Sequence, residues 1–353
     1  MIASDAQPSP PPTSSPPAPA PAAPGAAPAT ASRAAPATRP RPLLTHRQKI
    51  AAVAVAAALV GVPAVTRSGY LIGVVTVALI YAIWAMSLDC FSGLSGRENF
   101  GHSLFIGVGA YAAGYCSGVF GWNPWLGIPL GVGAAAAAGV VMGFPTLRLR
   151  GPYFSLAMLT AAAVAQRLLL IFWDRTGGEE GIQGLLPLIG SPLAYYYFVL
   201  AVTVGSGVVM VALARSRWGL LLRAIRGDEA TCQAAGIDVT WYKMTGLLVS
   251  AAFAGLGGVL YAHYQLQVSP QLFSILLVMT IVTMVYAGGI ATVYGAAGGA
   301  VVLSLLGELL RDLGAYRLLV YGVILMLVLF FLPQGAVAPL WRRLGARRGP
   351  EGA

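Results

Sequence analysis

The stretch GYLIGVVTVALIYAIWAMSL, residues 69–88, contains no charged side chain. An apolar run of about 20 residues is what an α-helix needs to cross the hydrocarbon core of a bilayer. Lipid offers the backbone no hydrogen-bond partners, so a crossing segment must be a helix or part of a closed barrel. The run shows none of the period-2 alternation of a barrel strand. We therefore predict an all-α integral membrane protein.

Similar apolar runs recur along most of the chain. Of its 353 residues, 57% are hydrophobic and only 10% are charged, and the mean hydropathy is +0.75. A soluble domain has roughly 25% charged residues. The predicted spans are 50–66, 69–88, 103–120, 125–147, 152–173, 193–213, 244–264, 272–291, 295–310 and 318–332. These spans predict a polytopic bundle of about ten transmembrane helices.

The formal net charge of +10 would suggest nucleic-acid binding in a soluble protein. Here the basic residues concentrate in alternate loops. With the N-terminus in the cytoplasm, the inner side receives Arg33, Arg39, Arg41, Arg47, Lys49, Arg97, Arg148, Arg150, Arg215, Arg217, Arg223, Arg226, Lys243, Arg342, Arg343, Arg347 and Arg348. The outer side receives only Arg67, Arg175, Arg311 and Arg317. This asymmetry follows the positive-inside rule, so we expect both termini in the cytoplasm, an even helix count and no nucleic-acid partner.

The two ends of the chain differ from the apolar region between them. Residues 1–42 are almost entirely Pro, Ala, Ser and Thr, which predicts a disordered cytoplasmic tail. The first apolar run begins only after this tail and has no convincing small-residue cleavage site behind it, so it is interpreted as a retained membrane anchor. We expect the membrane domain to cover residues 43–335 and a basic cytoplasmic tail to cover residues 336–353.

Three stretches are dense in small residues: Gly131–Gly143, Ala251–Gly258 and Gly288–Gly299. Helices in lipid associate through close backbone approach, which small residues permit. We interpret these stretches as packing surfaces of the bundle. The alternative is that some of the glycines let helices slide or break.

The segment DCFSGLSGRENFGH, residues 89–102, places Gly, Ser, Asn and ionisable residues between two apolar runs. Irregular backbone is tolerated at membrane depth only where protein buries it or where it lines a wet cavity. Transporters use broken helices to present backbone dipoles to a substrate. The segment is either a re-entrant part of a translocation path or an ordinary cytoplasmic loop. The path candidates are Gly96, Glu98, Asn99, Gly101 and His102, together with Arg167, which lies inside an apolar run and has snorkelling to the interface as its alternative.

The loop TGGEEGIQGL, residues 176–185, lies outside in this topology and is rich in glycine. It is either a docking loop for an extracytoplasmic partner or a plain solvated loop. The docking candidates are Thr176, Gly177, Gly178 and Gly181.

The longest charged interior segment covers residues 215–243. Within it, residues 228–235 predict a short helix, because an Asp can cap its N-terminus and a Gly fits the left-handed position after its C-terminus. A permease needs such a helix to receive force from a motor subunit, and a simple interfacial helix is the alternative. The candidates for this contact are Arg223, Arg226, Asp228, Glu229, Ala230, Ala235 and Gly236.

Several enzyme motifs are absent from the sequence. The two lysines, Lys49 and Lys243, follow Gln48 and Tyr242, so the chain has no Gly-Lys-Ser/Thr of a P-loop. The sequence also has no HExxH, no Cys/His cluster and no GxSxG. We expect no catalytic residue, no metal site and no cofactor in this chain.

Four places in the sequence, by their order and spacing, resemble the permeases of branched-chain amino acid (Liv-type) ABC importers, specifically the M-type member of the permease pair. They are Gly101-His102 with FIGVGAYAAG (105–114); FPTLRLRGPYFSLAMLT (144–160) with the later TGGEEGIQG; SRWGLLLRAIRGDEATCQAAGIDVTWYK (216–243) with SAAFAGLGGVLYAHY (250–264); and YGVILMLVLFFLPQG (321–335). The resemblance covers about residues 68–335.

The resemblance implies a transport subunit rather than an enzyme, in the inner membrane of a bacterium. It implies a second, H-type permease, two ATP-binding-cassette ATPase subunits that use ATP and Mg, and a periplasmic solute-binding protein. The short helix at residues 228–235 would be the coupling helix that inserts into an ATPase groove. The cargo would be branched-chain or other small or hydrophobic amino acids.

One departure from the family bears on the cargo. Where the family usually has Gly-Gln, an apolar residue and Ser before the Gly-His pair, this chain has Gly96-Arg97-Glu98-Asn99-Phe100. Two charges at this place leave urea or a short-chain amide as an alternative cargo. An ion-coupled secondary transporter is a further alternative, and it is disfavoured because only Arg167, Glu308 and Glu98 are candidate ionisable residues within the membrane.

Overall fold

The computed structural model describes residues 58–63, 68–149, 151–310, 322–323 and 326. The predicted tails, 1–42 and 336–353, lie outside these residues, as do most of the predicted spans 50–66 and 318–332. The helices are α2 (Gly69–Leu88), α3 (His102–Gly114), α4 (Gly127–Thr146), α5 (Pro152–Ile171), α6 (Trp173–Thr176), α7 (Pro192–Arg215), α8 (Arg217–Gly227), α9 (Glu229–Ala234), α10 (Val239–Gln265), α11 (Ile275–Gly288) and α12 (Tyr294–Leu309). Shorter elements are the π-helices η1 (Asp89–Gly93) and η2 (Tyr115–Val119), the 3-10 helices η3 (Pro124–Leu126) and η4 (Pro270–Phe273), and the strands β1 (Ile182–Gln183) and β2 (Gln267–Val268).

Five helical stretches in the described part of the chain are long and apolar enough to cross a membrane. They are Gly69–Gly93, Pro124–Thr146, Pro152–Ile171, Pro192–Arg215 and Val239–Gln265. Two more apolar helices, α11 and α12, are shorter. Each predicted span from 69–88 to 295–310 coincides with one of the helices, so the prediction of a polytopic helical membrane protein is confirmed. The count of about ten stays a prediction.

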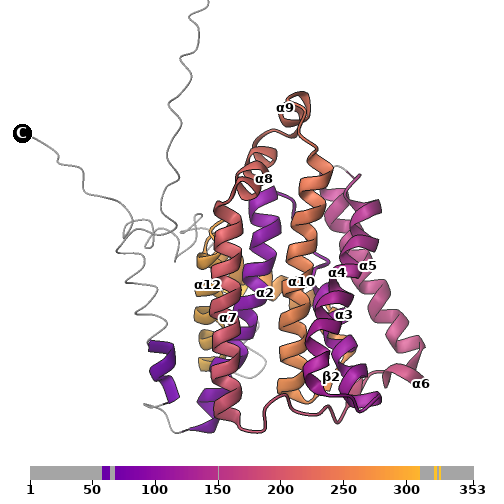
Figure 1. Cartoon of the computed structure of the whole chain (residues 1–353), viewed down its shortest axis with the longest axis vertical. Coiled ribbons are helices and arrows are strands. Elements are labelled where there is room, and N and C mark those ends of the chain that lie inside the picture. The colour runs from indigo at the N-terminus through magenta and orange to yellow at the C-terminus, as the bar shows by residue number, and fades with distance from the viewer. Residues whose placement is uncertain (1–57, 64–67, 150, 311–321, 324–325, 327–353) are drawn as a thin grey trace, which may run out of the picture. The chain divides into compact units, whose positions relative to one another are not determined.

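The long helices run side by side between two ends of the bundle (Figure 1). Helices α8 and α9 lie at one end, and α6 and β2 lie at the other. Helix α10 covers the whole distance between them, because it begins just after α9 and ends just before β2. We refer to the two ends as the α9 end and the α6 end.

Helix α10 is central and packs against α2, α3 and α4. Its contact with α4 uses a small residue at every fourth position, and the buried residues of α4 are Gly127, Gly131, Ala135, Gly139, Gly143 and Thr146. A Cβ on Gly131 would lie 2.2 Å from Cγ2 of Val259, and one on Gly255 would lie 2.4 Å from Cβ of Ala135. Glycines therefore let the two backbones approach closely, which supports the packing interpretation of these stretches.

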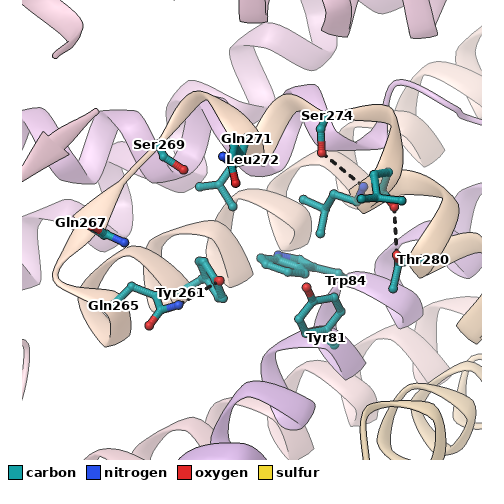
Figure 2. Close-up of a pocket in the computed structure, with 12 residues that line it drawn as sticks. Tyr81, Trp84, Tyr261, Gln265, Gln267, Ser269, Gln271, Leu272, Ser274 and Thr280 are labelled. Atoms are coloured by element: carbon teal, nitrogen blue, oxygen red, sulfur yellow. Dashed lines mark hydrogen bonds between the residues drawn. The ribbon is translucent and has the colours of Figure 1, made fainter. Parts of the chain in front are cut away.

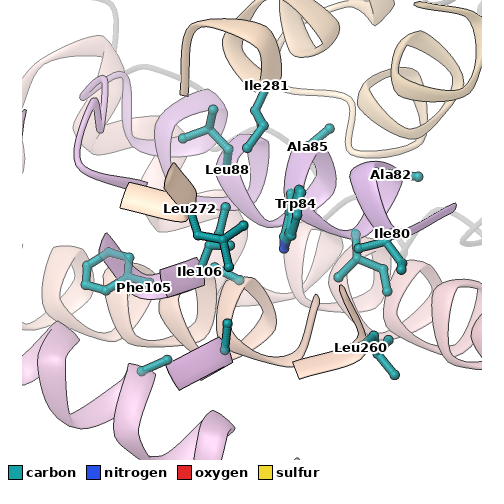
Figure 3. Close-up of a cluster of buried hydrophobic side chains, with 14 of the residues drawn as sticks. Ile80, Ala82, Trp84, Ala85, Leu88, Phe105, Ile106, Leu260, Leu272 and Ile281 are labelled. Carbon is teal, nitrogen blue, oxygen red and sulfur yellow. The ribbon is translucent and has the colours of Figure 1, made fainter. Parts of the chain in front are cut away.

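Large side chains fill the space where α2, α3 and α10 meet (Figure 3). Ile80, Trp84, Phe105, Ile106 and Leu260 are fully buried there. In contrast, large apolar side chains on the outer faces of α4, α5 and α7 are exposed, as lipid contact requires; they include Val141, Phe144, Leu156, Ile171 and Val208. The core of this protein is a small set of central helices, and the peripheral helices turn apolar faces outward.

The two short strands connect distant loops at the α6 end. Strand β1 pairs antiparallel with β2, with Ile182 opposite Val268 and Gln183 opposite Gln267. This pairing ties the connection between α6 and α7 to the connection between α10 and η4.

Candidate functional site

A short helix projects at the α9 end, where the sequence predicts one (Figure 1). The Asp228 carboxylate caps α9 by accepting hydrogen bonds from the backbone N–H groups of Ala230 (2.9 Å) and Thr231 (3.2 Å). The hydrogen bond from the Thr231 hydroxyl, together with these backbone bonds, lowers the pKa of Asp228. Gly236 follows the helix with a φ of 80°, which is left-handed. The predicted capping at both ends of this helix is confirmed.

One side of α9 is anchored and the other is exposed. Cys232 points inward and packs with Ile225 of α8 and Val239 of α10. The exposed residues are Ala230, Thr231, Gln233, Ala234, Ala235 and Gly236. Because the helix is anchored on one side and presents mostly small side chains on the other, another subunit could approach its exposed side closely.

Glu229, at the start of α9, joins three segments of the chain through one carboxylate. Its Oε2 lies 2.5 Å from Nζ of Lys243 on α10 and 3.1 Å from Nη2 of Arg97 in the segment after α2. The side chain of Lys243 is only 2% exposed and that of Arg97 is 12% exposed. Charge-assisted hydrogen bonds of this kind are stronger than neutral ones, so this cluster fixes the position of α9.

The electrostatics of this cluster favour an ionised carboxylate. Partial burial raises the pKa of Glu229, but hydrogen bonds and charge attraction from Lys243 and Arg97 outweigh it, so the pKa lies below its ordinary value. A carboxyl group with a lowered pKa stabilises the fold at neutral pH, and this contribution is lost as the pH falls through the lowered pKa. The cluster is therefore intact at neutral pH.

Two further contacts are made by arginines: one ties α8 to the last residue of η1, and the other ties Arg97 to the chain just after α4. Arg226 of α8 donates a hydrogen bond to the carbonyl oxygen of Gly93, and Arg97 also donates to the carbonyl oxygen of Leu149, just after α4. Of the predicted coupling residues, Arg226 and Glu229 thus contact the predicted path segment directly. Arg223 is exposed on α8.

The predicted path segment, residues 89–102, is buried for the most part, although Gly96 is exposed and Glu98 is half-buried. Helix α2 continues into η1, the chain turns at Gly96 with a φ of 73°, and α3 begins at His102. Asn99, Gly101 and His102 are buried, and the Ser87 hydroxyl lies 3.0 Å from Nε2 of His102. An ordinary solvated loop would not be enclosed in this way, so the structure favours the interpretation of a break within the bundle.

Glu98 connects this break to two other helices. Its carboxylate accepts a hydrogen bond from the hydroxyl of Tyr286 on α11, and its carbonyl oxygen accepts one from the Ser155 hydroxyl on α5 (2.6 Å). Arg97 is bound to α9, as described above. Both charges that depart from the family pattern therefore have partners within this chain.

Asp89 is a functional candidate that sequence reasoning missed. It is fully buried, and its carboxylate accepts hydrogen bonds from the backbone N–H groups of Ala291 (2.6 Å) and Val293 (2.7 Å). These residues have φ values of 61° and 49°, a region that costs energy for a residue with a side chain, most of all for a β-branched one. The carboxylate holds the strained turn between α11 and α12 in place. The available signal was an acidic residue inside an apolar run.

Removing this carboxylate tests its role. We expect Asp89→Ala to lower the stability of the membrane domain by about 2–5 kcal/mol, because two buried N–H groups lose their acceptor. Asp89→Asn keeps one acceptor oxygen, so we expect roughly half that loss. The measurement is the melting temperature of the purified protein in detergent. Equal melting temperatures for wild type and Asp89→Ala would contradict this role.

Arg167 does not lie with the other path candidates. It is exposed on the outer face of α5, about one turn before that helix ends. Ser155, which contacts the break, lies about 18 Å away along the helix axis. The structure thus brings Arg97 of the path segment into contact with Glu229 and leaves Arg167 at a separate place.

The predicted docking loop has a compact conformation at the α6 end. The hydroxyl of Thr176 is turned inward and donates to the carbonyl oxygens of Leu169 (2.5 Å) and Phe172 (3.0 Å). Gly177, Gly178 and Gly181 all have left-handed φ values, and a Cβ on Gly181 would lie 1.8 Å from the carbonyl oxygen of Val268. These glycines are required by the fold. An open hollow beside them, of about 730 Å³, is lined by Leu170, Trp173, Asp174, Gly177, Gly178, Glu179 and Glu180.

Comparisons with known proteins agree with this arrangement. The family model described as "Branched-chain amino acid transport system / permease component" matches residues 70–329. The high-affinity branched-chain amino acid transport system permease protein LivM of Escherichia coli (strain K12) is 30% identical over 341 residues, which are 87% of this chain and 80% of that protein. LivM of Salmonella typhimurium is 30% identical over 320 residues, covering 82% and 75%.

A permease of the other type also matches. The probable branched-chain amino acid transport permease protein LivH of Methanocaldococcus jannaschii is 24% identical over 297 residues, which are 76% of this chain and 92% of that protein. No solved structure shows a significant match. The matched residues include α2 to α12, the break after α2 and the α9 cluster. The chain therefore belongs to the family of permease components of branched-chain amino acid transport systems, the membrane permeases of ABC importers.

Proposed function

We propose that this chain is the M-type permease subunit of an importer for branched-chain or other small or hydrophobic amino acids. Its partners would be a second, H-type permease, two ATPase subunits that use ATP and Mg, and a periplasmic binding protein that delivers the solute. The observation that carries the proposal is the exposed helix α9, held to the break after α2 by the cluster of Glu229, Arg97 and Lys243.

The charge distribution supports a proposed orientation of the chain in an inner membrane. The basic residues at the α9 end are Arg97, Arg148, Arg215, Arg217, Arg223, Arg226 and Lys243. At the α6 end, the short helix α6 contributes Arg175. By the positive-inside rule the α9 end faces the cytoplasm, where the ATPase subunits are, and the α6 end faces the binding protein.

The contacts suggest how force from the ATPase subunits would reach the membrane helices. A push on α9 moves Glu229, which pulls Arg97 in the break. The next residue, Glu98, is hydrogen-bonded to Tyr286 of α11, so a displacement of the break also moves α11. Interfaces of this kind switch between two packed arrangements rather than deforming continuously. The bundle would therefore alternate between outward-open and inward-open states.

Two further observations support the remaining partners of this proposal. The match to a LivH protein supports a partner permease of similar sequence. The loop that contains Thr176 and Gly181, with its acidic hollow, is the proposed contact for the binding protein at the α6 end.

Two alternatives differ from this proposal in testable ways. The same machine carrying urea or a short-chain amide would have the same partners and a different solute. An ion-coupled secondary transporter would have no ATPase partner, and its coupling ion would need ionisable residues within the membrane.

Co-purification from the native membrane, followed by mass spectrometry, tests the proposal. We expect two ATPase subunits and a second permease to accompany the chain. Transport assays with the reconstituted complex would then compare leucine with urea and acetamide. A stable chain that is purified without any ATPase would contradict the proposal and support the secondary transporter.

A further inference from the structure

A cavity of about 390 Å³ lies between the middle of α2, the end of α10, η4 and the beginning of α11 (Figure 2). It is lined by Tyr81, Trp84, Tyr261, Gln265, Gln267, Ser269, Gln271, Leu272, Ser274, Leu276, Leu277 and Thr280. Gln267 belongs to β2 at the α6 end, and Trp84 belongs to the core. The cavity thus leads from the proposed outer side toward the centre of the bundle.

The lining combines aromatic rings with neutral polar groups. The rings of Tyr81 and Trp84 meet edge to face at 4.9 Å between centroids, and those of Trp84 and Tyr261 lie 5.4 Å apart. Opposite them lie three glutamines, two serines and a threonine on the chain from α10 to α11. The residues around the cavity include no Asp, Glu, Lys or Arg. Such a site can hydrogen-bond a solute without offering a counterion.

The indole N–H of Trp84 does not open into this cavity. It is fully buried and makes no hydrogen bond among the described residues. A Cβ on Gly257 would lie 2.5 Å from this nitrogen, so the nitrogen packs against the backbone of α10. Trp84 therefore contributes its ring, and not its donor, to the cavity wall.

Other polar groups around the cavity already have internal partners. Gln265 donates to the hydroxyl of Tyr261 (3.0 Å), Ser274 accepts from the N–H of Leu277 at the start of α11 (3.3 Å), and Thr280 donates to the carbonyl oxygen of Leu276 (2.9 Å). No such side-chain bond is seen for Gln267 and Gln271, which are exposed among the residues that the structure describes. The amides of these two glutamines are therefore available to a solute.

We infer that this cavity is a solute-binding site on the translocation path, for a small solute without net charge that has both polar and apolar parts. The inference rests on the proposed function. A solute with net charge would lose hydration here without gaining a counterion, which is costly. A zwitterionic aliphatic amino acid fits, because the glutamine amides can hydrogen-bond its carboxylate and its side chain can pack on the rings. Aromatic faces also attract an ammonium group.

This assignment gives Arg97 and Glu98 a role separate from the solute. The cavity and the charged break lie at opposite ends of α11: Leu276 and Thr280 line the cavity, and Tyr286 binds Glu98. Helix α11 therefore links the solute site to the contacts of α9.

Cysteine protection in the assembled transporter tests the assignment. The variant Gln271→Cys is reconstituted with the partner subunits and the binding protein, and its modification by a small thiosulfonate reagent is followed with and without leucine. The native cysteines, Cys90, Cys116 and Cys232, are buried. We expect leucine to slow the modification at least about fivefold, whereas Val208→Cys, exposed on the outer face of α7, reacts equally in both conditions. Equal rates at residue 271, or no modification in either condition because another subunit covers it, would overturn the assignment.

Two substitutions separate this inference from the proposed function. We expect Gln267→Leu, which removes an amide from the lining, to raise the KM for leucine uptake about tenfold with little change in kcat. Gln271→Glu places a charge in the lining and should reduce leucine uptake at least tenfold. If both variants co-purify with the ATPase subunits and take up leucine normally, the cavity assignment fails while the proposed function stands. If wild type lacks ATPase subunits, the proposed function fails.

Discussion

Glu229→Arg is expected to reduce solute uptake by the assembled transporter to below about one hundredth of the wild-type rate, while the chain remains folded in the membrane. The substitution replaces the carboxylate between Arg97 and Lys243 by a third cation. The side chain of Lys243 is almost fully buried, and a buried charge that loses its partner is strongly destabilising locally. Helix α9 would leave its position and no longer transmit force to the break.

The matched control for this prediction is Gly190→Arg, which introduces the same side chain at an exposed position near the other end of the bundle, where a Cβ would have no heavy atom within 4 Å. It should leave the coupling of ATP hydrolysis to uptake unchanged. A charge exchange, Arg97→Glu combined with Glu229→Arg, should recover part of the activity because it restores one ion pair. The measurements are leucine uptake and ATP hydrolysis in proteoliposomes. Wild-type uptake by Glu229→Arg at wild-type expression would refute the role of this cluster.

The second large effect is expected from Gly131→Leu, which should prevent α4 from packing against α10. A Cβ at this position would lie 2.2 Å from Val259 and 2.7 Å from the carbonyl oxygen of Gly109, which is backbone and cannot turn away. Overpacking of a well-packed contact usually costs about 1–3 kcal/mol, and a larger side chain against backbone costs more. We expect the yield of monodisperse protein in detergent to fall at least tenfold.

Gly133→Leu is the matched control on the same helix. A Cβ at Gly133 has no neighbouring heavy atom within 4 Å, so a larger side chain would extend into open space. Size-exclusion profiles and melting temperatures of the two variants should therefore differ sharply. Similar losses in both would show that helix propensity, and not the contact with α10, determines the effect.

Sequence reasoning succeeded where the information is local. An apolar run such as residues 69–88 identifies a membrane helix by its own length and composition. Likewise, α9 was predictable because Asp228 and Gly236 act on backbone groups within a few residues of themselves. Arg226 and Glu229 were expected at a contact with another subunit, and the structure adds their bonds within the chain.

The parts that sequence reasoning could not supply depend on pairs that are far apart in the chain. Arg97 was considered as a residue near a solute, but it binds Glu229, 132 residues later. The partners of Asp89 lie 202 and 204 residues away. The cavity beside Trp84 also arises only when α2, α10 and α11 come together. The residue pattern within one segment cannot predict these contacts, because each of them forms between segments that only the tertiary structure brings together.

The contact between Asp89 and the turn at residues 291–293 has a consequence for biosynthesis. Chains are made from the N-terminus at roughly 5–20 residues per second, so α2 and Asp89 are complete about 10–40 seconds before the backbone donors of this carboxylate exist. During that interval an acidic group at membrane depth lacks the N–H donors that it has in the native structure. A nascent chain is therefore expected to stay with the insertion machinery until α11 and α12 arrive, and chains that end before residue 291 should be degraded as unfinished products.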